Sequence, residues 1–326
     1  MSESKGVVLA ALVANAVIAG LKFVGFLLTG SAAMLSESYH SMSDTGNQVF
    51  LLVGIWFGNK EADRSHPFGH GKAQFFYSFL VSVLLFGIAG FASVREGYNA
   101  VVHHEAHLTT GTAAVPLTDV TVPGVWVSYG VLVGAMFFEG YAWQKGYRHL
   151  RSLKREHDWN GIRETFKRTS DVTTLTAFTE DTVAITGLVV ALVGLYVTHA
   201  TGNPLYDGVA ALVIGLLLMG SALALAWENK RLLLGESLPP GSEQELRRIA
   251  NDWDGVEYLH DLRSVYFGQD RVVVTADVSV DEGMTADDLD ETITELESTL
   301  RDANGKVAEV YVEPRTSGMA SSVPDV

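Results

Sequence analysis

The amino-acid sequence predicts an all-α membrane domain of six helices followed by a small, acidic α/β domain. Of the 326 residues, 48% are hydrophobic, and they stand in long blocks, as in membrane-spanning helices. The charge is uneven: from Glu236 onward there are 21 Asp and Glu against 7 Lys and Arg, so 14 of the net 15 negative charges lie there. We therefore expect a transmembrane domain at 1–235, a cytoplasmic domain at 236–315 and a flexible tail at 316–326.

Six apolar runs are long enough to cross a hydrocarbon core, which needs about 20 residues. They are expected at 7–29, 34–57, 74–99, 124–146, 172–198 and 205–228. Basic residues gather in two connections, 58–73 and 147–171, and the other three connections contain no Lys or Arg. The positive-inside rule then predicts a multi-pass protein of the cell membrane with both termini in the cytoplasm.

The C-terminal part alternates between helical and strand patterns. Ser242-Glu243-Gln244-Glu245 fits a capping box at the start of a helix. VEYLHDLRSVYFG and RVVVTADVSVD are typical of two strands, with a turn at Gln269-Asp270. A helix over 285–303 and a last strand, KVAEVYVEP, follow. This αββαβ order predicts a small open α/β sandwich.

Composition also narrows the class of function. The chain has no cysteine, which excludes disulfides and thiolate metal ligands. It has no His-Glu-x-x-His pattern and no phosphate-binding P-loop, so we expect neither a membrane metalloprotease nor ATP-driven transport, and no enzyme. No nucleic-acid partner is expected. The acidic tail would suit a halophilic prokaryote, and a solvated acidic surface is the alternative.

Residues 36–48, SESYHSMSDTGNQ, place polar groups inside an apolar run. Helical spacing puts Glu37, His40, Asp44 and Asn47 or Gln48 on one stripe. An ionised carboxylate in mid-bilayer costs about 2.5–3.5 kcal/mol, so Asp44 needs a partner or a water-filled cavity. Histidine and aspartate one turn apart can bind one divalent ion together; such ligands suit Zn²⁺ and tolerate Mn²⁺, Co²⁺ or Fe²⁺.

Two other predicted helices carry acidic residues at membrane depth. Glu180 and Asp181 are adjacent and point about 100° apart, so we expect one of them to face the stripe. Glu139 lies near the middle of the fourth run. The alternative for each is a hydrogen bond to a neighbouring helix.

Several motifs together resemble one family. They are HSMSDTGNQ, HPFGHGKAQ, TEDTVAITG, TGNPLYDG, LLLGES and LHDLRSVYFG. Nearly from end to end, the chain resembles the cation diffusion facilitator family of divalent-metal/proton antiporters. It is most similar to the branch that holds the mitochondrial zinc transporter of animals. The resemblance implies a ferredoxin-like cytoplasmic domain and a homodimer in the lipid bilayer that exports metal from the cytoplasm by alternating access.

The resemblance also assigns residues in the membrane. His40 and Asp44 match both ligand positions of the second helix, and Asp181 matches the second position of the fifth. The first position of the fifth helix is Ala177, so one ligand is missing. Candidates for the fourth ligand are water, Glu180, Asn47 and Glu37.

Metal and proton are expected to compete for the same atoms, because ligation needs neutral histidine and ionised carboxylates. His40 is the natural proton carrier, since histidine titrates near neutral pH, and Glu139 is a further candidate. Zn²⁺ is the expected substrate; Mn²⁺, Co²⁺, Fe²⁺ and Cd²⁺ are alternatives. A metal-sensing membrane protein that does not transport is the second hypothesis.

Outside the membrane, His66 and His70 match loop histidines that bind metal in the family, and Asp63 would assist them. The alternative is that they are solvated loop residues. His260 matches a ligand of the binuclear site of some members. The other ligands are expected to be replaced, by Ala276, Tyr311 and Glu313. The resemblance therefore implies a dimerising domain without a full binuclear zinc centre.

Overall fold

The computed structural model describes residues 2–102, 112–114, 121–156, 172–281 and 283–316. Nearly all of the predicted tail, 316–326, thus lies outside the described residues, as does the second part of the 147–171 connection, from 157 onward. Contacts divide the chain into two compact units. The first contains Met1–Leu52 and Ser78–Trp227, and the second contains Val53–Tyr77 and Glu228–Val326. The predicted domain boundary at 235 stays a prediction.

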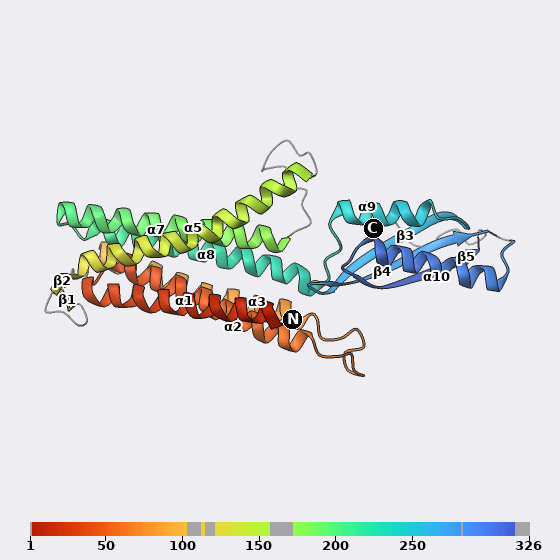
Figure 1. Ribbon diagram of the computed structural model, residues 1–326, viewed down its shortest axis with the longest axis horizontal. Helices are drawn as coiled ribbons and strands as arrows, with labels where there is room; N and C mark the ends of the chain where they lie inside the picture. Colours follow the sequence, from red (N-terminus) through yellow and green to blue (C-terminus); the bar gives the residue numbers. More distant parts are fainter. Residues whose placement is uncertain (1, 103–111, 115–120, 157–171, 282, 317–326) are drawn as a thin grey trace. The chain divides into compact units, whose positions relative to one another are not determined.

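Long helices form wherever the sequence predicts a span (Figure 1). They are α1 (Ser2–Thr29), α2 (Ala32–Gly58), α5 (Gly124–Glu156), α7 (Val172–Thr201) and α8 (Leu205–Leu234). The third run is helical in three pieces: α3 (Ala73–Val81), the π-helical turn η1 (Ser82–Phe86) and α4 (Gly87–Val102).

Length and hydropathy identify four described helical stretches that can cross a membrane. They are Ala73–Val102, Gly124–Arg155, Phe178–Thr201 and Leu205–Leu234, and Asn15–Thr29 is a shorter apolar helix. The chain therefore has a helical transmembrane domain. The polar stripe lowers the hydropathy of α2, and a total of six spans stays a prediction.

Some boundaries differ from the sequence-based expectation. The helix α5 continues ten residues beyond the expected end at 146, because the basic residues that follow the apolar run are good helix formers. The predicted connection 103–122 contains two short antiparallel strands, β1 (Thr112–Ala114) and β2 (Thr121–Pro123). Neither strand was predicted.

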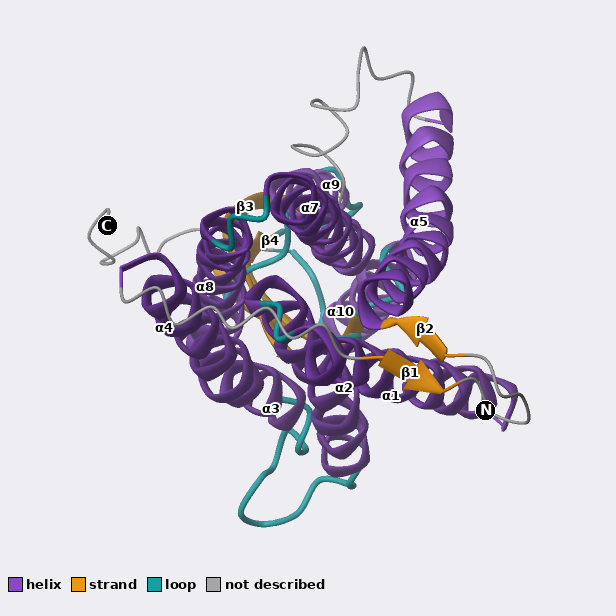
Figure 2. Cartoon of the chain, turned by 90° about the vertical axis from the view of Figure 1, so that its left-hand side faces the viewer, coloured by secondary structure: helices purple, strands orange, loops and turns teal. Residues whose placement is uncertain are grey.

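The first half of α2 is the buried centre of the first unit (Figure 2). Seen roughly along the helix axes, α2 lies among its neighbours, and residues 31–38 are all buried. On other sides of the bundle, glycines bring helices together. A Cβ on Gly97 of α4 would lie 2.5 Å from the backbone nitrogen of Leu212 on α8, and one on Gly215 would lie 2.6 Å from that of Val94. Such close packing is what small residues permit in membrane helices.

The second unit contains an α/β domain with the predicted order of elements. It comprises α9 (Pro240–Asn251), β3 (Val256–Gly268), β4 (Arg271–Val280), α10 (Ala286–Ala303) and β5 (Val307–Thr316). The central strand β4 pairs antiparallel with β3 and parallel with β5. The predicted turn at Gln269-Asp270 is confirmed.

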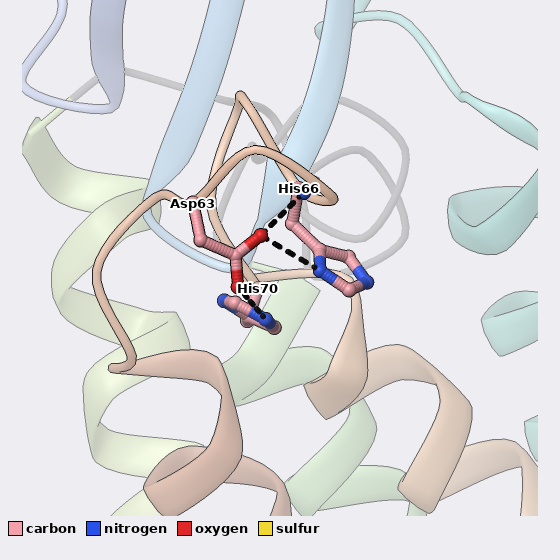
Figure 3. A group of neighbouring side chains, drawn as sticks. All are labelled: Asp63, His66 and His70. Atoms are coloured by element: carbon pink, nitrogen blue, oxygen red, sulfur yellow. Dashed lines mark hydrogen bonds and ion pairs between the residues drawn. The ribbon is translucent and has the colours of Figure 1, made fainter.

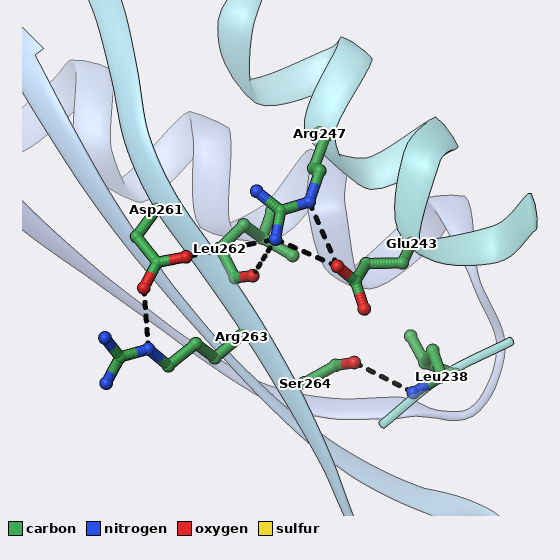
Figure 4. A network of polar contacts seen from close by, with 7 residues as sticks. All are labelled: Leu238, Glu243, Arg247, Asp261, Leu262, Arg263 and Ser264. Atoms are coloured by element: carbon green, nitrogen blue, oxygen red, sulfur yellow. Dashed lines mark hydrogen bonds and ion pairs between the residues drawn. The ribbon is translucent and has the colours of Figure 1, made fainter. Parts of the chain in front are cut away.

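Alternation along β4 builds the core of this domain. One set of side chains is buried together with residues of both helices: Val272, Val274, Ala276, Val278, Leu246, Ala250, Leu296 and Leu300. Polar contacts hold α9 and the segment before it to β3 (Figure 4). Arg247 donates to Glu243 and to the carbonyl of Leu262 over 2.6 Å, and the N–H of Leu238 donates to Ser264 over 2.9 Å.

The capping box predicted at Ser242 is wrong. The helix α9 already begins at Pro240, after Pro239, and no side chain caps it. Proline fixes φ near its helical value, so the N-cap is Pro239, three residues earlier than the polar pattern indicated. A capping box is present instead at α10, where Thr285 and Asp288 exchange hydrogen bonds.

Candidate metal-binding sites

The polar stripe of α2 carries the first candidate site. The Nε2 atom of His40 lies 3.7 Å from Oδ2 of Asp44, one helical turn further along. The His40 side chain is 7% exposed and that of Asp44 is 26% exposed. Among the described residues, neither ring nitrogen of His40 has a hydrogen-bond partner. The ring nitrogens of His40 are therefore available to bind a cation beside the Asp44 carboxylate.

Acidic side chains from two other helices act on this pair. Asp181 on α7 and Asp44 repel one another, and Glu139 on α5 is affected by the charges of His40, Asp44 and Asp181. In the described residues, however, the ligand atoms of His40, Asp44 and Asp181 do not all lie within 4.8 Å of one another. The fold thus brings α2, α5 and α7 to one region and leaves the three ligands apart.

The position of the fourth ligand is only partly described. Ala177 belongs to α7, and its side chain lies outside the described residues. Glu180 is partly exposed on the same helix. Glu37 has one carboxylate oxygen occupied, because Oε2 accepts a hydrogen bond from Lys22 over 2.7 Å.

The loop after α2 gathers a tighter cluster (Figure 3). Within the described residues, Asp63, His66 and His70 are the one group of three acidic or histidine side chains whose ligand atoms all lie within 4.8 Å of one another. One oxygen of Asp63 lies 3.4 Å from Nδ1 of His66, and the other lies 3.5 Å from Nε2 of His70. One carboxylate and two imidazoles form a suitable ligand set for Zn²⁺.

Backbone hydrogen bonds orient the carboxylate of this cluster. The N–H groups of His66 and Ser65 both donate to Oδ1 of Asp63 over 2.7 Å. The N–H of His66, with a smaller contribution from Ser65, holds the pKa of Asp63 below its usual range. Asp63 is therefore ionised well into the acidic range, as a metal ligand must be.

The loop is packed against the hairpin of β3 and β4, which belongs to the same compact unit. A Cβ on Gly71 would lie only 2.3 Å from the carbonyl oxygen of Phe267. The rings of Phe68 and Phe267 are 4.8 Å apart, and the ammonium of Lys72 lies 4.9 Å from the centre of the Phe267 ring. The last residue of the metal cluster, His70, is thus one position from a close backbone contact.

Comparison with known families decides the identity of the fold. Residues 8–234 match the family model of the cation efflux transmembrane domain, and residues 238–314 match that of the cation efflux protein cytoplasmic domain. The chain belongs to the cation diffusion facilitator family. This confirms the resemblance seen in the motifs, and the α/β domain is the cytoplasmic domain of a cation diffusion facilitator.

Three relatives are similar to most of this chain. The human mitochondrial proton-coupled zinc antiporter SLC30A9 is 30% identical over 275 residues, which cover 84% of this chain and 46% of the human protein. Metal tolerance protein C4 of Arabidopsis thaliana is 26% identical over 82% of this chain and 55% of its own length. The magnetosome protein MamM of Paramagnetospirillum magneticum is 26% identical over 79% of this chain and 72% of its own length. The chain spans about half the length of the first two of these relatives.

The cytoplasmic domain of this cation diffusion facilitator uses its expected ligand positions for other contacts. The Nε2 atom of His260 is 2.7 Å from the hydroxyl of Ser279, and Ala276 is part of the core. Tyr311 donates to Glu309 over 2.8 Å. In the described part of the domain, these residues do not gather into a metal cluster.

Two buried charged residues of the membrane domain were missed by the sequence analysis. Lys22 on α1 is 1% exposed and contacts α2, and Asp207 on α8 is 1% exposed and contacts the start of α2. A signal was available for Lys22, because an ionisable residue within an apolar span needs a buried partner. Asp207 lies at the edge of its apolar run, where acidic residues are common, and carries no such signal.

Proposed function

We propose that this cation diffusion facilitator carries a divalent metal ion, Zn²⁺ first of all, out of the cytoplasm in exchange for protons. The observation that carries the proposal is the pairing of His40 and Asp44, 3.7 Å apart on α2, which we take as the second of the six expected spans. The working unit would be a homodimer of six-span protomers with ferredoxin-like cytoplasmic domains, in the cell membrane and with cytoplasmic termini. Each protomer would alternate between inward-facing and outward-facing states.

The mechanism follows from competition between metal and protons. Metal entering from the cytoplasm binds His40, Asp44 and Asp181, with Glu180 or water completing the site. Imidazole must be neutral and carboxylates ionised to bind it, so protons on the far side displace the ion. His40 and Glu139 then hold protons while the carrier returns, because Glu139 lies where the charges of the ligands act on it.

The ligand set and the relatives support this choice of substrate. A histidine with carboxylates suits Zn²⁺, and Mn²⁺, Co²⁺, Fe²⁺ and Cd²⁺ are the alternatives. The human relative is named a proton-coupled zinc antiporter, and this chain covers 46% of it. The second candidate is a metal sensor that does not transport, which the cluster of Asp63, His66 and His70 favours because it would bind metal outside the membrane.

Flux measurements separate these functions. Purified protein in sealed vesicles with an imposed pH gradient should move Zn²⁺, and the flux should vanish when the gradient is collapsed. Asp44→Ala and Asp181→Ala should each reduce the flux by at least about a hundredfold, whereas Asp270→Ala, at an exposed turn, should leave it unchanged. Transport by Asp44→Ala at the wild-type rate would refute the site, and metal binding without any flux would favour the sensor.

A further inference from the structure

A lysine is almost completely buried in the first helix, at 1% exposure. Lys22 on α1 donates from Nζ to Oε2 of Glu37 over 2.7 Å and to the hydroxyl of Ser41 over 2.8 Å, both on α2. Glu37 is 0% exposed. Its other oxygen, Oε1, has no hydrogen-bond partner among the described residues and faces Gly187 on α7, where a Cβ would lie 2.6 Å from it.

Stability alone does not explain this pair. Removing two charges from water costs several kcal/mol per ion, and the attraction between them roughly offsets that cost at best. Two apolar side chains of similar volume would hold α1 against α2 as well or better. We therefore expect the role of the two charges to lie in their effect on neighbouring residues.

Their surroundings are the residues of the proposed metal site. Glu37 and Ser41 stand on either side of His40 along α2. The charges of Lys22 and Glu37 both act on Asp44, with opposite sign, and Lys22 also acts on Glu139. Because Lys22 and Glu37 together add no net charge, Asp44 and Asp181 supply two negative charges, which match one divalent ion when water completes the site.

We propose that Lys22 sets the net charge of the carrier site by neutralising Glu37, which serves as its counter-ion and not as a metal ligand. The proposal rests on the proposed transport function, since it concerns the same site. It makes Lys22 a positioning residue whose effect on the metal is electrostatic. Removing either charge alone leaves the other uncompensated beside a bound cation, and the two removals act in opposite directions.

Measurements of Zn²⁺ affinity on the whole 326-residue chain test whether the two removals shift it in opposite directions. Titration at pH 8, in a His70→Ala background that weakens the loop cluster, isolates the membrane site. Lys22→Gln leaves an extra negative charge, so the Zn²⁺ dissociation constant should fall at least about tenfold. Because the more tightly bound Zn²⁺ is released more slowly, the maximal flux should also fall. Glu37→Gln leaves an extra positive charge, so the dissociation constant should rise at least about tenfold. The double variant should lie within about threefold of the parent protein.

A purely mechanical brace between α1 and α2 predicts a different pattern. Both single variants would then weaken binding, and the double variant would weaken it as well. Shifts in the same direction, or no shift in either variant, would overturn the proposal. Lys22→Arg keeps the charge and should bind like the parent.

Two further measurements keep the test decisive. If the single variants do not fold, the double variant and the exchange Lys22→Glu/Glu37→Lys remain, and both must bind Zn²⁺ within about threefold of the parent. A folded double variant that has lost more than tenfold in affinity refutes the proposal. Flux of the parent protein is measured in parallel: binding without flux would refute transport, while the opposite shifts would still support the role of Lys22.

Discussion

Asp207, at the start of α8, accepts a hydrogen bond over 2.6 Å from the hydroxyl of Ser31, the residue before α2. Its other carboxylate oxygen accepts from the backbone N–H of Ala33 over 3.3 Å, and Ser31 in turn accepts from the N–H of Met34 over 3.1 Å. The first N–H groups of a helix have no partner within the helix. One helix therefore caps another, and this fixes the end of α2 that precedes His40.

Loss of this cap should destabilise the membrane domain. Asp207→Ala leaves the Ser31 hydroxyl and the Ala33 N–H unpaired in a buried site, which should cost about 2–3 kcal/mol. The midpoint of thermal unfolding in detergent micelles should fall accordingly. Ser31→Ala keeps the bond between Asp207 and Ala33, so its loss should be about 1 kcal/mol. Unfolding of Asp207→Ala at the parental temperature would show that the cap adds nothing.

Zn²⁺ binding to the loop cluster should weaken in acid. Zn²⁺ needs neutral imidazoles and an ionised carboxylate, and backbone N–H groups hold the pKa of Asp63 below its usual range. In an Asp44→Ala/Asp181→Ala background, binding at the cluster should therefore fall as protons compete with the metal for the imidazole nitrogens, and not because Asp63 is neutralised. Calorimetric titration at pH 7.5, 6.5 and 5.5 measures this. Binding that persists unchanged at pH 5.5 would exclude His66 and His70 as ligands.

The contact between the loop and the hairpin should tolerate no side chain at Gly71. In Gly71→Ala the new Cβ meets the carbonyl oxygen of Phe267 at 2.3 Å, and a backbone oxygen cannot move aside easily. We expect a loss of about 1–3 kcal/mol and faster amide exchange in the loop and in the hairpin, measured by mass spectrometry. Gly241→Ala is the matched control, because nothing lies within 4 Å of its Cβ. Equal exchange in both variants would rule out a tight contact.

Sequence periodicity predicted the elements well and their ends less well. Apolar blocks located every long helix, and alternation located the three strands of the cytoplasmic domain, because burial repeats along the chain at the period of each element. The end of α5 lies beyond its apolar run, since helix propensity continues where hydrophobicity stops. The strands β1 and β2 have three residues each, which is too short for a pattern.

Some contacts in the candidate sites could be predicted from sequence spacing, and others could not. His40 and Asp44 are one turn apart, so their proximity follows from helical spacing alone. The partners of Lys22 and Asp207 lie 15 and 176 residues away, and no local pattern contains such a contact. Asp63 joins His66 and His70 through a turn whose backbone bonds are not visible in the sequence, which is why it was expected only to assist.

The ion pair of Arg271 and Glu309 should make the cytoplasmic domain sensitive to acid. Arg271 on β4 donates to Glu309 on β5 over 2.5 Å and holds the pKa of Glu309 below its usual range. A lowered pKa means that the stabilisation is present above the unfolded value of about 4.3 and is lost as the pH falls below it. The pair is partly exposed, so Glu309→Gln should cost less than about 1 kcal/mol at pH 7 and a smaller amount near pH 3. Denaturant unfolding at both pH values measures this, and an equal cost at both would contradict an ionic contribution.

Thr285 and Ser242 look alike in sequence, but only Thr285 caps a helix. Thr285 caps α10: its hydroxyl accepts from the N–H of Asp288 over 3.3 Å and donates to the Asp288 carboxylate over 2.6 Å. Thr285→Ala should cost about 1 kcal/mol and speed amide exchange in the first turn of α10. Ser242 has the same sequence signature but lies inside α9, where no side chain caps the helix. Ser242→Ala should therefore be neutral or slightly stabilising, because alanine has the higher helix propensity. If Ser242→Ala destabilised the protein as much as Thr285→Ala, Ser242 would be the N-cap of the helix and Pro240 would not be its first residue.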